Sequence, residues 1–153
     1  MAVTVSGLFL PTWIDVLDAT QLALNLDAED HKVAMFKNTI TPNFSTDTAF
    51  GVSPYTSPGD PEVSGTGYTA GGAALTGTAV SESPTGSLMW DATDTSWAGS
   101  TITNARCALI YADALAGNNA IMLINFGADY STSSGTFTIQ YAAGGLFAID
   151  LTP

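Results

Sequence analysis

Short runs rich in apolar residues recur at regular spacing over the second half of the chain, and apolar and polar residues alternate most cleanly in TFTIQYA. The six runs are TGTAVSE, GSLMWDA, RCALIYA, AIMLINFG, GTFTIQYA and GLFAIDL. Turn-forming Gly, Pro, Ser and Asn residues separate them. A period of two indicates half-buried strands, and regularly spaced short strands are typical of sandwiches and barrels. With LALNLD and HKVAMF upstream, the pattern predicts an all-β protein, an antiparallel β-sandwich of about eight short strands that is jelly-roll-like or Ig-like.

The spacing also predicts two hairpins. In residues 135–142, Phe137, Ile139 and Tyr141 fall on one side of a strand, and the turn AGG follows. We therefore expect this strand to pair with LFAIDL. Upstream, residues 22–27 and 31–36 flank the acidic turn AED and predict a first hairpin.

Two segments depart from this pattern. Residues 8–19 predict a short helix, with Pro11 in its first turn and Trp13, Ile14 and Leu17 on one face. Residues 38–62 hold four prolines and many turn formers, which indicates an extended, exposed excursion. We expect an N-terminal helical or extended interaction segment over residues 1–20 and a single β-sandwich domain over 21–153 that carries the excursion.

The number and sign of the charged residues limit the classes of partner that the chain can bind. Charged residues make up only 11% of the chain, and 14 acidic residues face three basic ones, for a net charge of −11. Phosphate backbones and anionic lipid surfaces need clusters of Lys and Arg, so we expect no nucleic acid and no membrane as partners. The N-terminus has no cationic region, and Pro11, Asp15 and Asp18 interrupt its apolar stretch. It therefore fits neither a signal peptide nor a spanning helix.

The glycine run EVSGTGYTAGG comes close to a dinucleotide-binding fingerprint. Such a cradle needs a strand before the first glycine and a helix after the last. Here prolines precede the run, the spacing has one residue too many, and strand-like residues follow it. We therefore expect these glycines to serve backbone geometry, with a positive φ at Gly67.

No motif assigns catalytic, cofactor-binding or metal-binding residues. His31 is the only histidine and lies in AEDHK, which indicates a solvated turn; Cys107 is the only cysteine and lies in an apolar run, which indicates a buried thiol. The acidic groups DATD and DAED could contribute calcium ligands but match no calcium-binding motif. We expect no cofactor, no metal and no enzymatic activity.

Trp90 and Trp97 flank DATDTS. A carbohydrate-binding module would expose a row of such rings on one sheet face. Because Leu88 and Trp90 share one side of their strand, we expect both tryptophans in the core, with a sugar platform as the alternative.

Four stretches resemble a family of small structural proteins of tailed bacteriophages, attributed to the head surface or the tail. They are HKVAMFKNTITPNFSTDTAFG, EVSGTGYTAGGAALTG, LMWDATDTSWAGSTITNARCALIY and INFGADYSTSSGTFTIQYAAGGLFAIDL. The order and spacing of EVSGTGYTAGG and W-A-x-S-T-I-T-x-A carry the resemblance, which spans nearly the whole chain after the N-terminal segment. The loop SPYTSPGDP is longer and richer in proline than the family pattern. The resemblance implies a place in the virion, assembled in the host cytoplasm, and it assigns no catalytic residue.

We therefore expect a non-enzymatic virion component. The first hypothesis is a capsid decoration or cement protein on the head exterior, a homotrimer that contacts the major capsid protein and copies of itself. The alternatives are a tail fibre, baseplate or tail-tip component, or a carbohydrate-binding module that attaches to the host. The candidate interface residues, with packing on their own sandwich as the equal alternative, are Phe9, Trp13, Phe44, Phe50 and Tyr55.

Overall fold

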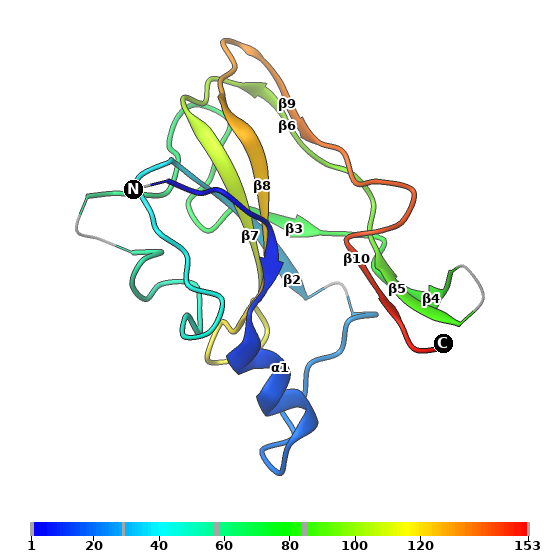
Figure 1. Cartoon of the computed structure of the whole chain (residues 1–153). Coiled ribbons are helices and arrows are strands. Elements are labelled where there is room, and N and C mark those ends of the chain that lie inside the picture. Colours follow the sequence, from blue (N-terminus) through cyan, green and yellow to red (C-terminus); the bar gives the residue numbers. More distant parts are fainter. Residues whose placement is uncertain (1, 29, 57–58, 84–85, 153) are drawn as a thin grey trace.

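The computed structural model describes residues 2–28, 30–56, 59–83 and 86–152. The described residues form ten strands and one short helix (Figure 1). Every strand pairing is antiparallel. The expected all-β, antiparallel, sandwich-like fold is confirmed, with more strands than the eight that the pattern predicts.

The largest sheet has five strands in the order β1-β8-β7-β2-β3. Their bounds are β1 Gly7–Leu8, β8 Ala120–Tyr130, β7 Ala105–Ala112, β2 His31–Phe36 and β3 Ala73–Leu75. We call it the central sheet. Since β1 pairs with Leu123 and Met122 of β8, residues from the N-terminal segment form one edge of this sheet.

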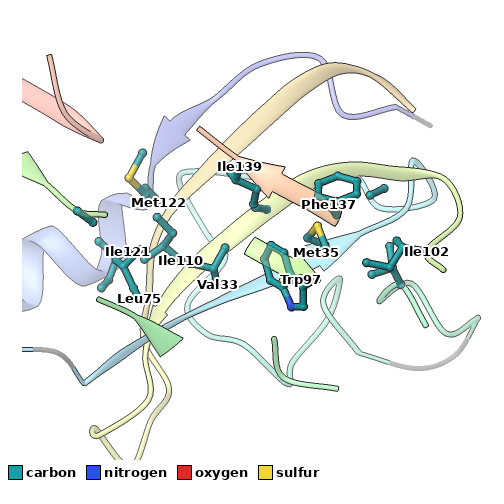
Figure 2. Close-up of a cluster of buried hydrophobic side chains, with 14 of the residues drawn as sticks. Val33, Met35, Leu75, Trp97, Ile102, Ile110, Ile121, Met122, Phe137 and Ile139 are labelled. Carbon is teal, nitrogen blue, oxygen red and sulfur yellow. The ribbon is translucent and has the colours of Figure 1, made fainter. Parts of the chain in front are cut away.

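Two smaller sheets lie against one face of the central sheet. One has the order β10-β5-β4, with β10 Phe147–Asp150, β5 Ser87–Asp91 and β4 Ala79–Glu82, and the other pairs β6 Thr95–Ser100 with β9 Gly135–Ile139. Figure 2 shows part of the core between the layers, where Trp97 and Phe137 from the small sheet meet Met35 of the central sheet. This cluster is the core that the alternation in GTFTIQYA predicts.

The central sheet is buried on both faces. Val33 and Met35 of β2 point into the core of the sandwich, whereas Ala34 and Phe36 join a second buried cluster on the other face. Residues from 38–62 cover that second face, with Ile40 and Tyr55 fully buried. The excursion is confirmed as free of regular strands among its described residues, but its description as simply exposed is wrong, because it forms a third layer.

The prediction of two hairpins is wrong. β9 pairs with β6, and β10 pairs with β5. The turn closes as expected, since the Gly145 N–H donates to Ala142, but the next amide, Leu146, donates to Trp90 and directs the chain onto β5. Upstream, the described residues 21–28 contain no strand, and β2 pairs with β7 and β3.

The helix α1 spans Leu10–Leu17, within the expected range, with Pro11 in its first turn. Its faces differ from the expectation. Thr12 is buried and donates from Oγ1 to the Ala120 carbonyl at 2.6 Å, and the Trp13 ring packs on Phe147 at 5.4 Å. Trp13 therefore faces the domain, while Ile14 and Leu17 face solvent.

Candidate interaction surfaces

The five candidate interface aromatics pack largely on their own chain. Phe9 lies 5.1 Å from Phe44 and 5.9 Å from Tyr55 between ring centroids, and Phe50 stacks on Tyr111 at 4.4 Å. Phe9 and Tyr55 are buried, and the other three are partly buried. These contacts agree with the equal alternative, packing on the chain's own domain, since the aromatic residues of the excursion cover one another and the second face of the central sheet.

Three exposed apolar residues of the N-terminal segment lie on α1. Leu10, Ile14 and Leu17 are 50%, 49% and 83% exposed, and their spacing of four and three places them on one side of the helix. We call these three residues the α1 face. Branched aliphatic side chains that gather on one exposed face mark surfaces for partners more often than scattered ones do. Within the described residues, these three side chains have no cover comparable to that of Phe9, which is fully buried.

The glycine run bends the chain across the edges of two sheets. Gly67 has φ +77°, as expected, and a Cβ there would lie 3.0 Å from the Ser100 Cα. A Cβ at Gly65 would overlap the Thr101 carbonyl, and one at Gly72 the Val33 carbonyl. The glycines thus permit close approach of backbone to backbone, and a strand rather than a helix follows them.

A polar network fixes the same run to the central sheet. The Tyr68 hydroxyl donates to Glu62 at 2.7 Å and accepts from the Met35 amide at 2.9 Å. The Gly71 amide donates to Glu62 at 2.7 Å, and the Tyr111 hydroxyl donates to the Gly71 carbonyl at 2.8 Å. Burial raises the pKa of Glu62 above its usual value despite these two donors. The polar groups of this network form their hydrogen bonds with other groups of the same chain, which indicates a structural role.

His31 and Cys107 lie on opposite faces of the central sheet. His31 is buried at the start of β2, on the same face of the central sheet as Val33. Its ring centroid lies 5.5 Å from that of Trp90. Its expected place in a solvated turn is wrong, because the strand begins at His31 itself. Cys107 is buried as expected, and burial raises the pKa of its thiol to about 12. A thiol held protonated and separated from the histidine by a sheet forms no catalytic pair.

Carboxylates of the two acidic turns accept hydrogen bonds from backbone amides of distant residues. Asp27 accepts from the Val80 amide at 2.6 Å, and Asp94 accepts from the Tyr141 amide at 2.9 Å. Glu29 of DAED lies outside the described residues. Across the described ranges, no group of three or more His, Cys, Asp and Glu side chains is placed to hold a metal ion.

Both tryptophans of the sugar-platform alternative are core residues. Trp90 is fully buried and donates from Nε1 to the Leu26 carbonyl at 2.8 Å, and Trp97 is 5% exposed. Their core placement is confirmed. A ring that is covered by Tyr68 and Phe137 offers no face to a sugar, so the platform built on Trp97 is excluded.

Comparison of the chain with protein-family models, with curated proteins and with solved structures gives no match. In the part of the chain that the structure describes, no helix has the length and apolarity required to cross a membrane.

Proposed function

We propose that the protein is a non-enzymatic structural component of a bacteriophage particle, and specifically a decoration protein on the head exterior. The observation that carries the proposal is the α1 face, an apolar surface that the chain presents to solvent. The resemblance to virion structural proteins is the reason for proposing that this particle is a bacteriophage. A low content of charged residues also suits the role, because a weakly charged surface loses little hydration when it is buried.

The size of the α1 face supports an oligomer over a lone subunit. Fully burying a Leu or Ile side chain contributes roughly 1.5–3 kcal/mol, so covering the exposed fractions of these three residues contributes about 3–5 kcal/mol. Association costs about 4–15 kcal/mol in lost rigid-body freedom. One α1 face therefore holds a subunit weakly, whereas a trimer that engages three such faces at once gains by multivalency. We include a homotrimer in the proposal on this ground.

The experiment compares attachment of two variants to purified particles that lack this chain. Leu17→Glu places a charge at the most exposed position of the α1 face and should abolish attachment. Leu151→Glu is the matched control, because Leu151 is also a strongly exposed leucine and lies beyond β10. Circular dichroism and urea unfolding verify that both variants remain folded. Attachment of Leu17→Glu at the wild-type level would contradict the proposed surface, and failure of the wild-type chain to attach would contradict the proposed function.

A further inference from the structure

A cleft of about 410 Å³ lies between β8 and β9. Its apolar lining comes from Ile124 and Phe126 of β8 and from Phe137 and Ile139 of β9. The Phe126 and Phe137 ring centroids lie 6.1 Å apart. Tyr130, at the end of β8, is about half exposed and also lines the cleft. The volume falls in the range of ordinary binding sites, about 300–1,000 Å³.

One wall of the cleft is the edge of a strand. The five consecutive residues Thr136–Gln140 line it, and successive residues of a strand point to opposite faces. A strand that contributes residues of both orientations meets the cleft with its backbone edge. Among the residues that the structure describes, β9 pairs only with β6, so alternate backbone N–H and C=O groups of β9 point away from β6. No hydrogen bond within the described residues joins them to β8.

A bulge in β8 keeps this edge uncovered. The link between β8 and β9, residues 131–134, is short enough for a hairpin, yet Figure 1 shows the two strands diverging from it. β8 pairs instead with β7, and between the pairs Cys107↔Asn125 and Ala105↔Tyr130 it advances by five residues against two. Gly127, with φ +79°, lies in this bulge. The bulge directs β8 away from β9 and leaves room for one further strand.

The charges around the cleft limit what can enter. Its lining contains no charged side chain, although the chain as a whole carries a net charge of −11. One carboxylate lies near each end: Asp129 precedes Tyr130 and pairs with Arg106, and Asp94 bonds to the amide that follows Gln140. β9 itself carries neither Lys nor Pro, the residues that protect exposed edges from pairing. Because Arg106 already pairs with Asp129, the attraction for basic residues comes from Asp94 and from the net charge of −11; a complementary occupant is uncharged in the cleft and basic where it leaves it.

We propose that this cleft binds an extended segment of a partner protein, which adds a strand to the free edge of β9. The segment is uncharged over about four or five residues, with small or branched apolar side chains on alternate positions toward Ile124 and Phe126, and basic residues flank it. Main-chain hydrogen bonds to β9 supply the affinity, and the apolar wall supplies the preference for alternate side chains. The site is separate from the α1 face, so it can be tested, and can fail, independently of the proposed function.

The test uses the purified full chain and a synthetic peptide, Lys-Val-Thr-Val-Thr-Val-Lys. Hydrogen exchange followed by NMR should show alternate amides of β9 exchanging about tenfold more slowly when the peptide is present at ten times its Kd. The matched control is the same peptide with N-methylated backbone amides on alternate residues, which keeps the side chains and removes the main-chain donors. We expect it to give no protection.

Two variants give a second readout. Tyr130→Ala removes an exposed ring from the β8 wall and should weaken peptide binding several-fold, whereas Val52→Ala, an exposed change in the excursion, should leave it unchanged. Equal binding of the N-methylated peptide would overturn the proposal. So would protection confined to other strands, or protection of β9 by maltotriose instead of the peptide. Protection that grows with protein concentration alone would also overturn it, because a second copy would then occupy the cleft.

Discussion

Replacing Tyr55 tests whether residues 38–62 form a structural layer. Tyr55 is 2% exposed, and its ring packs edge-on against Phe9 and Phe36, at 5.9 and 5.3 Å between centroids. Its hydroxyl donates to Asp47, itself 9% exposed, at 3.1 Å. The ring therefore joins the excursion to Phe36 on the second face of the central sheet, whereas the hydrogen bond to Asp47 lies within the excursion and stabilises its fold.

The expected magnitudes separate the two contributions. Truncation of a buried aromatic ring to alanine costs roughly 3–5 kcal/mol, so Tyr55→Ala should remove that amount from the free energy of unfolding. Tyr55→Phe keeps the ring and removes the donor, and it should cost about 1–3 kcal/mol because Asp47 loses a partner in a buried place. Val52→Ala, at an exposed position of the same excursion, should change the free energy by less than about 0.5 kcal/mol.

Urea unfolding followed by tryptophan fluorescence measures all three variants. The slope of the free energy against urea should stay constant, which shows that the same surface is exposed on unfolding. If Tyr55→Ala remained within about 1 kcal/mol of the wild type, the excursion would not cover the sheet in solution. A loss that is equal for Tyr55→Ala and Tyr55→Phe would assign the whole effect to the hydroxyl and contradict the packing argument.

Two further predictions concern the backbone and the buried histidine. Gly67→Ala should destabilise the fold by about 1–3 kcal/mol in urea unfolding, because a side chain there has a positive φ and lies close to the Ser100 backbone. Gly144→Ala is the control and should cost far less, because its side chain would enter open space. Equal costs for the two variants would contradict the role of φ. Burial lowers the pKa of His31 below its usual 6.5, so the stability tied to its neutral form is complete above pH 6.5 and is lost as the pH falls below it. Between pH 7.5 and 5.5 the wild type should therefore lose more stability than His31→Gln, and parallel losses in the two proteins would exclude this origin. The raised pKa of Glu62 acts in the opposite direction, but it is common to both proteins and cancels in their difference.

The alternation of residues could predict strands and their inward faces, but not their partners. Phe137 and Ile139 are buried and Thr136 and Thr138 are exposed, as the period of two requires. Pairing depends on contacts between distant segments, and a tight turn after β9 does not oblige the next strand to return to it. A run such as RCALIY shows no alternation because β7 is covered on both sides. The continuous apolar runs of β7 and of β2, HKVAMF, were therefore signals in the sequence for a third layer.

The candidate surface could be predicted only in part. The helix was evident, but apolar residues occur on both of its sides, so the pattern did not show that Trp13 turns inward while Leu17 turns outward. Irregular segments such as the excursion have no period, so nothing in the spacing distinguishes a buried Tyr55 from an exposed one. The open edge of β9 depends on a bulge in another strand, which no local pattern of residues reveals.

Counting this chain in purified particles tests the proposed function most directly. Quantitative mass spectrometry gives its number of copies relative to the major capsid protein. A decoration protein on the head predicts hundreds of copies in a fixed ratio to the shell. A handful of copies, or a few dozen, would contradict a place on the head surface, and absence of the chain from the particle would contradict a structural role in the virion.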